Sequence, residues 1–458
     1  MKTRSIFVAV VGASLLTITT ALPATALTES DFGDIVSFGE NGYAPAIVSG
    51  PADGTSLVVY ADEEIFGQFV DTELGMVGAP FQLSNADTYS SNPPTAEWNP
   101  ERQEWLVVWE ENEEVVAGRI VEHGVGAVGS QMTISDSHDG STFGDMELAY
   151  AAYAADQDVY LVAFKATVTV GEGSDCQAAF GVFVNADGTV PTTEATILST
   201  PDAEVCAEQV DNGANVDYSP ATSRWLVGWA YSNGANAATT GTVLVENVAG
   251  VVTIDVGPVI VGSNSRRVHP AIEHDSTRDR FLTSWHADTQ VFGALVDNAG
   301  AQIGTRFAVN SVDARGDQRS ARMIYDAAAD LFLTVNHNTG DDEADPIVQP
   351  FVGYWELAGA TGASAAAPQV LSDPLVQSER PDITIAGDCV LVVWQWEIYD
   401  ELTDSSTSGL QGRSSCFTPE LAATGATDTT ALIGLGALVA LALGGALMIA
   451  RRPRIARV

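Results

Sequence analysis

The chain has 458 residues, with 60 acidic and 20 basic side chains and a formal net charge of −40 at neutral pH. No basic stripe that could neutralise phosphates is present, which argues against nucleic-acid binding. The length accommodates one large domain or a few ordinary ones, and a field of this sign attracts cations and basic partners.

The N-terminus has the three parts of an export signal. Lys2 and Arg4 form a basic start, an apolar run extends from Ile6 to Ile18, and Ala24-Thr25-Ala26 provides small residues at a cleavage site. The apolar run is shorter than the roughly 20 residues that a membrane-spanning helix needs. We therefore interpret residues 1–26 as a signal peptide, with Leu27 as the first residue of the mature chain.

An apolar strand flanked by aromatic residues recurs about every 56 residues after the signal peptide. Its copies are Leu57–Tyr60, Trp105–Trp109, Tyr160–Phe164, Trp225–Trp229, Phe281–Trp285, Phe332–Val335 and Val390–Trp394. Trp105 and Val107 point to one face of their strand and Leu106 to the other, so the strand needs an apolar cover on both sides.

Three further strands surround each copy. A first strand opens near a proline (45–47, 94–96, 270–272, 381–383), a third contains glycine (66–68, 117–119, 180–182, 292–294), and a fourth ends the unit (81–84, 132–135, 307–310). Hairpin turns such as 185–188 and 297–300 join the third strand to the fourth.

Four short strands per unit, covered on both faces, are typical of propeller blades stacked around an axis. The chain is all-β and resembles a seven-bladed β-propeller over residues 27–416. The seventh unit has only three strands, and Asp34-Ile35-Val36-Ser37 matches the missing fourth. An N-terminal strand would thus close the ring and remove an exposed edge. A string of small β-sandwiches and a β-solenoid are the alternatives.

The four cysteines suit an exported chain with two disulfides. Cys389 begins the second strand of the seventh unit and Cys416 ends the third, so they face each other in a hairpin. Cys176 and Cys206 fall in two loops that a propeller places on one face, and we expect them to form the second pair.

Catalytic motifs are scarce. The zinc-protease, serine-hydrolase and EF-hand patterns are absent. Residues 137–143 resemble one Asp-box of the sialidase propellers, but the string occurs once and is one residue short, so we interpret it as an ordinary turn.

Glu97, Asp217 and Glu273 occupy the same position in the innermost strands of the second, fourth and fifth units. We expect these carboxylates to face the axial channel and converge there. Converging carboxylates raise each other's pKa, and serve as acid and base or hold a hard cation such as Ca²⁺. The alternative is a wet channel lined by solvated polar groups.

Loops after the second strand are long in the third, sixth and seventh units, at 166–179, 336–350 and 395–408. Long loops on one face of a rigid scaffold usually carry binding function. The ligand-binding candidates on this face are Trp396, Tyr399, Tyr231, His286, His269, Arg267 and Arg380. Aromatic side chains among polar groups suit a carbohydrate or a peptide.

The C-terminus contains the string Leu421-Ala422-Ala423-Thr424-Gly425, an uncharged run over 431–450 and an arginine-rich end. The run is long enough to cross a bilayer, and the arginines hold the end in the cytoplasm. This tail resembles the sorting signal of sortase-anchored Gram-positive surface proteins, in the actinobacterial form with Ala422 in place of the commoner proline. The resemblance implies that sortase cuts after Thr424 and joins it to peptidoglycan.

The sequence therefore predicts a signal peptide (1–26), a propeller (27–416), a linker with the sorting pentapeptide (417–425) and a transmembrane helix with a basic tail (426–458). We interpret the protein as a wall-anchored binding module for glycan or protein ligands, without a required cofactor. A propeller enzyme acting on polysaccharide and a structural envelope protein are the alternatives.

Anchoring is tested at Thr424. Replacing Thr424 with alanine removes the residue that the sortase would join to the wall, so the protein should move from the wall fraction to the membrane fraction. Immunoblotting of fractionated cells measures this. Unchanged wall linkage would refute the sorting signal.

Overall fold

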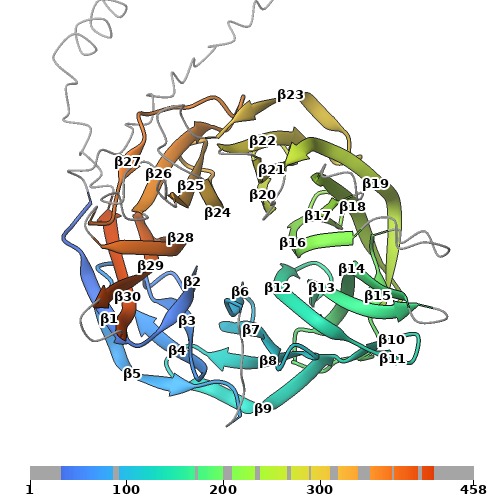
Figure 1. Ribbon diagram of the computed structural model, residues 1–458, viewed down its shortest axis with the longest axis horizontal. Helices are drawn as coiled ribbons and strands as arrows, with labels where there is room; N and C mark the ends of the chain where they lie inside the picture. Colours follow the sequence, from blue (N-terminus) through green and yellow to red (C-terminus); the bar gives the residue numbers. More distant parts are fainter. Residues whose placement is uncertain are drawn as a thin grey trace, which may run out of the picture. The chain divides into compact units, whose positions relative to one another are not determined.

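The computed structural model describes residues 32–85, 92–170, 174–199, 209–232, 238–265, 270–287, 290–309, 318–338, 351–373, 376–400 and 405–416. These residues form seven four-stranded antiparallel sheets and one two-stranded hairpin. The sheets are arranged around a central axis, with β2, β6, β12, β16, β20, β24 and β28 innermost (Figure 1). The predicted seven-bladed β-propeller is thus confirmed.

The first three blades follow one another along the chain. Blade 1 contains β2 (Tyr43–Ser49), β3 (Ser56–Asp62), β4 (Glu64–Val70) and β5 (Met76–Gln82). Blade 2 contains β6 (Thr95–Asn99), β7 (Glu104–Glu111), β8 (Val115–Glu122) and β9 (Gly126–Ser135). The hairpin of β10 (Ser137–His138) and β11 (Ser141–Thr142) precedes blade 3, which contains β12 (Gly144–Ala154), β13 (Val159–Val170), β14 (Ser174–Asn185) and β15 (Thr196–Ile197).

The remaining blades repeat the pattern. Blade 4 contains β16 (Gln209–Ser219), β17 (Arg224–Ser232), β18 (Ala238–Val248) and β19 (Val251–Ser265). Blade 5 contains β20 (Ala271–Asp275), β21 (Arg280–Ala287), β22 (Gln290–Val296) and β23 (Gln302–Ala308). Blade 6 contains β24 (Gln318–Asp326), β25 (Leu331–Asn338), β26 (Phe351–Ala358) and β27 (Gln369–Val370). Blade 7 contains β28 (Gln377–Ala386), β29 (Cys389–Asp400), β30 (Ser405–Cys416) and β1 (Val36–Glu40).

The second strand of each blade is covered on both faces, as its sequence predicts. In β7, Trp105, Val107 and Trp109 pack with blade 1 residues such as Leu57. Leu106 and Val108, which point the other way, pack with blade 3 residues such as Val162 and Phe164. All five β7 side chains are fully buried. Stacking of neighbouring blades therefore builds the core.

The N-terminal strand closes the ring. β1 pairs antiparallel with β30, with Val36 opposite Gly412 and Phe38 opposite Leu410. Arg413 secures the approach to this strand, since its Nε donates to the carbonyl of Gly33 at 2.7 Å and its Nη2 to that of Phe32 at 3.1 Å. The strand lies two residues later than the predicted 34–37, but the predicted closure is present.

Two segments that we predicted as loops are instead extended hairpin arms. Most of 166–179 belongs to β13 and β14, which stay paired from Val159 opposite Asn185 to Val170 opposite Ser174. Ala166, Val168 and Ala178 are buried, so apolar contacts extend the arm. Residues 395–400 and 405–408 likewise belong to β29 and β30. Of the third predicted loop, 336–338 end β25, and 339–350 lie outside the described residues.

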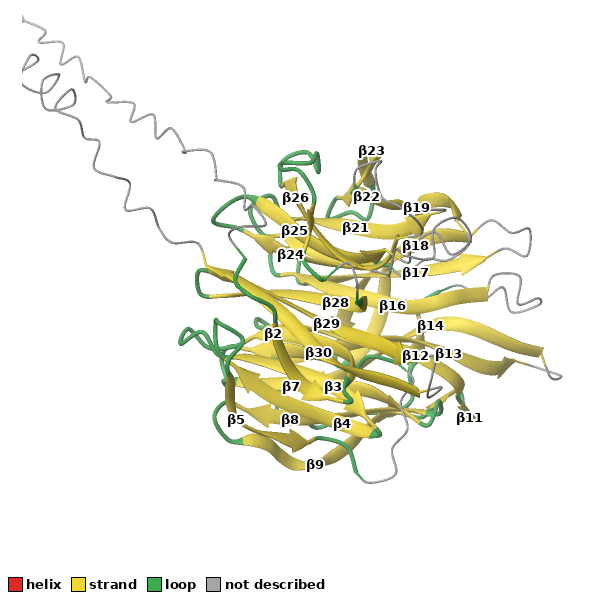
Figure 2. Cartoon of the chain, turned by 60° about the vertical axis from the view of Figure 1, so that its left-hand side comes forward, coloured by secondary structure: helices red, strands yellow, loops and turns green. Residues whose placement is uncertain are grey.

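Cys389 and Cys416 form the predicted disulfide. Cys176 lies in β14 opposite Val168, but Cys206, the signal peptide, Leu421–Gly425 and the C-terminal apolar run lie outside the described residues. The described part of the chain consists of strands and loops (Figure 2). It contains no helix long and apolar enough to span a membrane.

Ring closure is tested at Phe38. This side chain is buried between blades 7 and 1 with Ile47, Val58 and Leu391. Phe38→Ala should lower the free energy of unfolding by about 3–5 kcal/mol, because it leaves a cavity at the closure. Met76→Ala, on the outer strand β5 where Met76 is 60% exposed, should change it by less than about 0.5 kcal/mol. Denaturant titration measures both, and equal effects would mean that β1 does not hold the ring.

Candidate functional site

The three predicted channel carboxylates share one register position. Glu97 lies opposite Leu106, Asp217 opposite Leu226 and Glu273 opposite Leu282. Each of these leucines is the second residue of the recurring aromatic strand in its blade. The other blades place Val48, Ala152, Ile324 and Thr384 there. These three residues thus occupy one position, as the sequence predicted, and the structure extends that position to the other four blades.

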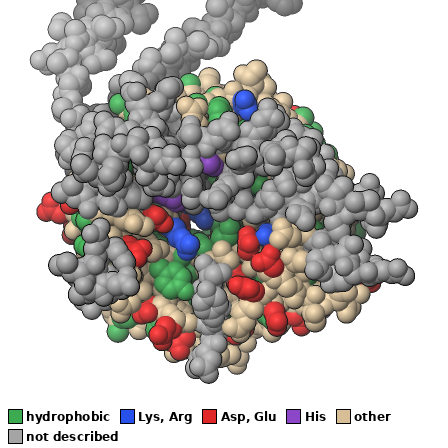
Figure 3. Space-filling model, in the orientation of Figure 1, with side chains coloured by type: hydrophobic (Ala, Val, Ile, Leu, Met, Phe, Trp, Pro, Cys, Tyr) green, Lys and Arg blue, Asp and Glu red, His purple; other side chains and the backbone are tan. Residues whose placement is uncertain are grey.

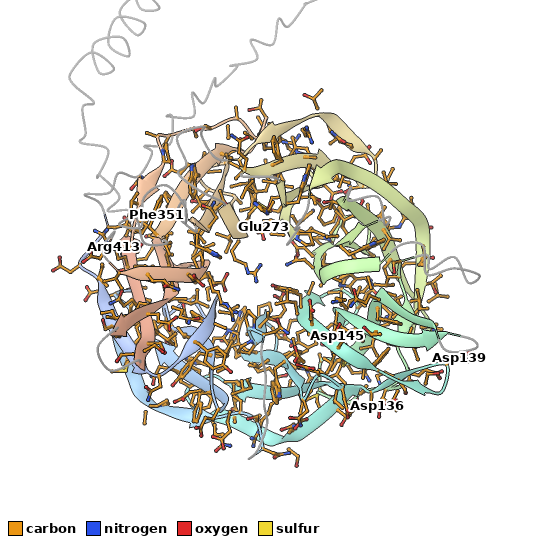
Figure 4. The ribbon with its side chains drawn as sticks, viewed as in Figure 1. Asp136, Asp139, Asp145, Glu273, Phe351 and Arg413 are labelled. Carbon is orange, nitrogen blue, oxygen red and sulfur yellow. The ribbon has the colours of Figure 1, made fainter. Side chains whose placement is uncertain are left out.

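These side chains line an axial cavity of about 760 Å³. Its walls come from the first strands of the blades, and Glu97, Asp217 and Glu273 are all half-buried in it. Glu273 lies at the central opening of the ring in Figure 4. The three predicted carboxylates thus meet in one cavity.

Each carboxylate also joins its blade to the next. Oε1 of Glu97 accepts a hydrogen bond from the backbone N–H of Tyr153 at 3.2 Å. Asp217 accepts from the N–H of His274 at 2.5 Å, and Glu273 from that of Tyr325 at 2.8 Å. At the same position of blade 7, Thr384 accepts from Ser49 at 3.0 Å. These bonds satisfy N–H groups on the inner edge strand of the following blade, which has no further strand beside it.

A second polar level lies two residues earlier in the inner strands. Here Asp382 accepts from the N–H of Ile47 at 2.8 Å, and Asn215 from that of Ile272 at 3.2 Å. Arg322 of blade 6 reaches across the axis to Tyr150 of blade 3. Its Nη2 donates to the tyrosine hydroxyl, and its guanidinium carbon lies 5.0 Å from the ring centre.

The sequence analysis missed Arg322, Tyr150 and Asp382. A bulge interrupts the register just before each of them. In the bulges of β12 and β28, Leu148 and Arg380 have φ values of 48° and 51°. Bulges redirect the side chains around them, but these bulges lie before the second polar level, which keeps strict alternation with the shared position two residues later. Counting back two residues from the shared position is the signal that an alignment of the seven inner strands could have used.

Burial dominates the electrostatics of the cavity. It raises the pKa of Glu97 to about 8, helped by the charge of Asp217 and opposed by the Tyr153 N–H. Burial, with the charges of Asp217 and Glu97, also raises the pKa of Glu273 well above its usual value. The pKa of Asp217 is raised by burial and that of Asp382 rises to about 6, the latter against the attraction of Arg322. Glu97 is therefore largely protonated at neutral pH.

Aromatic side chains support the inner strands next to the carboxylates. Trp98, Tyr153, Tyr218, His274 and Tyr325 each follow the shared position and pack on the first aromatic residue of the second strand, with ring centres 4.4–5.1 Å apart. Three of them also bond an aspartate five residues later, the partners being Asp158, Asp279 and Asp330. These contacts fix the backbone that presents the cavity groups.

The predicted loop-face candidates do not form one described patch. Trp396 lies in β29 opposite Ser378, half-buried, and its indole packs over Gly409, where an added Cβ would lie 2.9 Å from Nε1. His286 is buried in β21, which removes it from the exposed face. Arg380 lines the axial cavity, and its N–H donates to Nδ1 of His337 at 3.4 Å.

Four other candidates lie at least partly outside the described part. The backbones of Tyr231 and Tyr399 belong to β17 and β29, but the side chains of both residues lie outside the described part. Arg267 and His269 lie outside it entirely. Among the described residues no group of three or more Asp, Glu, His or Cys side chains has metal-binding geometry.

The string that resembles an Asp-box forms the β10–β11 turn. Asp139 and Gly140 occupy it with φ values of 48° and 74°, and Phe143 packs edge-on against Phe164 and Phe180. Asp136 and Asp139 lie at the outer rim, away from the axis (Figure 4). This agrees with an ordinary turn.

No family model and no curated protein matches the chain. Solved structures similar in fold include puromycin hydrolase (13% identity, TM-score 0.48, covering 80% of this chain and 53% of that one). A second is polysaccharide lyase Uly1, with 8% identity and a TM-score of 0.46, covering 81% of this chain and 89% of that one. A third is the Hadza microbial sialidase Hz136, with 10% identity and a TM-score of 0.46, covering 79% of this chain and 76% of that one. The chain spans about half the length of the puromycin hydrolase. At these identities the similarity extends to the fold alone.

The raised pKa of Glu97 predicts a pH-dependent stability. Because its folded-state pKa is about 8 against a usual 4.5, the native state holds more protons than the unfolded state between these values, and stability falls as pH rises through them. Glu97→Gln keeps an oxygen for the Tyr153 N–H and cannot ionise. It should be more stable than wild type at pH 8.5, by on the order of 2 kcal/mol.

Melting temperatures from pH 5 to 9 test this. The melting temperature should fall less steeply with rising pH for Glu97→Gln than for wild type. Glu73→Gln, at an exposed turn, should follow wild type. Parallel curves for all three proteins would contradict the assignment of Glu97 as a buried, proton-holding group.

Proposed function

We propose that this protein is a wall-displayed binding module that receives its ligand in the axial cavity. The observation that carries the proposal is the cavity itself, about 760 Å³ and lined by both charged and aromatic side chains. A concave site of this size with a few placed polar groups is the usual form of a ligand-binding pocket. The cavity replaces the Trp396 region as our choice of contact site, because Trp396 packs on its own hairpin.

The positions of the carboxylates favour binding over catalysis. Glu97, Asp217 and Glu273 each hold a backbone N–H of the next blade, so moving one of them during a reaction cycle would release an edge strand. A glycosidase also needs one ionised carboxylate beside a protonated one, at a set separation. Here burial raises the pKa values of all three carboxyl groups, that of Glu97 to about 8, which disfavours the ionised partner.

The C-terminal sequence supports a location next to the wall. Only residues 417–424 separate Cys416 from the proposed attachment at Thr424, which is about 26 Å of extended chain at about 3.3 Å per residue. A tether of this length, with the sorting signal and the peptidoglycan link that it implies, would keep the propeller among envelope polymers. We therefore propose envelope glycans, or proteins and peptides close to the wall, as the source of the ligand.

The test compares variants of the full-length protein for binding to purified wall polymer by co-sedimentation. Wild type should bind, Arg322→Gln should bind at least about tenfold more weakly, which is about 1.4 kcal/mol, and Trp396→Ala should bind like wild type. If Trp396→Ala were the only variant to lose binding, the ligand site would lie at the outer hairpins instead of in the cavity. Shortened polymer in the supernatant would instead establish the polysaccharide-degrading alternative.

A further inference from the structure

The axial cavity opens between the short turns that follow the first strands of blades 2, 3 and 4. Pro100, Ala155 and Pro220 are the first residues after β6, β12 and β16. All three are exposed, and all three line the cavity. The cavity is therefore open to solvent on this side of the ring, which we call the turn face.

The other end of the cavity is crowded by charged groups that already have partners. Arg322 donates to the Tyr150 hydroxyl across the axis, and its Nε lies 4.0 Å from a carboxylate oxygen of Asp382. Glu379 and Arg380 line this end as well. Figure 3 shows basic and histidine side chains near the centre of this face, with acidic ones around them. A ligand therefore enters more readily from the turn face.

Aromatic surface lines the wall just inside the turn face. Trp98 packs on Trp105, with ring centres 4.4 Å apart, and its half-buried side chain lines the cavity. Among the described residues, no acceptor takes a hydrogen bond from the indole N–H of Trp98. Tyr153 and Tyr218 line the same wall, but aspartates of the blade 3 turn hold their hydroxyl groups. Trp98 thus offers apolar surface and a hydrogen-bond donor together.

Carboxyl groups lie one residue deeper in the inner strands. Glu97 and Glu273 each use Oε1 to accept an interblade bond, and within the described part of the chain Oε2 of neither takes part in a hydrogen bond. Burial raises the pKa of Glu97 to about 8, and a protonated carboxyl group both donates and accepts. The floor of the cavity therefore offers hydrogen bonds of both kinds.

The charges around the cavity disfavour an ionic ligand. The chain has a net charge of −40, which repels anions. Glu97, which keeps its proton at neutral pH, presents no full charge to a cation. Both oxygens of Asp217 already accept from the backbone N–H groups of Tyr218 and His274. The walls thus favour a ligand without net charge that can donate and accept hydrogen bonds.

We propose that the cavity binds a neutral, hydroxyl-rich sugar unit that enters from the turn face, with its ring against Trp98 and its hydroxyl groups at Glu97 and Glu273. The C–H surface of a sugar ring is apolar and packs on an aromatic side chain that has a polar edge. Each sugar hydroxyl both donates and accepts, as the floor requires. This inference rests on the proposed binding function and specifies its ligand class.

The size and shape of the cavity fit a short oligosaccharide. Its volume of about 760 Å³ lies within the range of roughly 300–1,000 Å³ that is typical of small-molecule sites. Because Arg322 and Tyr150 join across the axis at the far end, a long chain does not pass straight through. The cavity therefore suits the end of a glycan chain or a short branch.

Oligosaccharides released from purified wall polymer by mild acid, and separated by anion exchange into a neutral and an acidic pool, test the inference. In equilibrium dialysis with the full-length protein, the neutral pool should bind with an apparent affinity at least tenfold higher than that of the acidic pool. Binding confined to the acidic pool, or equal affinities for both pools, would overturn the inference.

Two kinds of variant test the position of the site. Trp98→Ala should weaken binding of the neutral pool at least tenfold, which is about 1.4 kcal/mol, and Trp98→Phe should restore part of it. Ala155→Arg places a long side chain at the mouth and should weaken binding at least threefold. Ala327→Arg, at the matching exposed position of the blade 6 turn and away from the cavity lining, should bind like wild type. Both alanines are exposed, so this pair remains informative even if Trp98→Ala folds poorly, and equal effects of the pair would contradict entry at the turn face.

Competition with intact wall polymer separates this inference from the proposed function. A neutral pool that displaces the protein from the polymer supports both. Polymer binding that neither pool displaces would overturn the sugar inference and leave the binding function intact. No binding to the polymer or to either pool would overturn both.

Discussion

The structure depends on one constraint, which is that every blade presents an unpaired strand edge to the axis. Backbone N–H groups left without acceptors in a narrow channel are costly. This chain supplies the acceptors from the preceding blade, as Glu97 does for Tyr153, Glu273 for Tyr325 and Thr384 for Ser49. The ring is thus held together near its axis by polar bonds, and further out by the apolar stacking of the blades.

Using carboxylates for this purpose has an electrostatic consequence. A threonine or asparagine accepts the same bond without charge, as Thr384 and Asn215 show. Glu97, Asp217 and Glu273 instead bring three acids into one cavity, where burial raises the pKa values of all three and repulsion from neighbouring acids raises those of Glu97 and Glu273 further. Neutral residues accept such bonds without the cost of burying an acid, so we connect the acids with the proposed binding function. Arg322, which reaches across the axis to Tyr150, places a positive charge at the neighbouring polar level, two residues before the carboxylates in the inner strands.

The sequence revealed the parts of this design that repeat. The aromatic strand, the closure by β1 and the shared position of Glu97, Asp217 and Glu273 all follow from patterns with a fixed register. Arg322, Tyr150 and Asp382 lie at the alternate position two residues before the shared one, but the residue type at that position differs between blades, so no repeated pattern marked them. The arms of β13 and β14 were mistaken for a loop although Thr167-Val168-Thr169-Val170 alternates β-branched residues as a strand does, because the repeat frame ended the second strand at Phe164. The side chain of Trp396 looked exposed in sequence, and only the packing over Gly409 shows otherwise.

Closure of the ring and occupancy of the cavity use the same carboxyl groups without competing for the same atoms. One oxygen of Glu97 and of Glu273 holds the neighbouring blade, and the other faces the cavity. A hydroxyl group bound there would complete the hydrogen bonding of the buried acids, and a ligand that binds only the folded ring also stabilises it by mass action. Under the proposed binding function, the inner strands would therefore couple ligand binding to the integrity of the ring. At the proposed location next to the wall, the propeller would then be most stable where its ligand is most abundant.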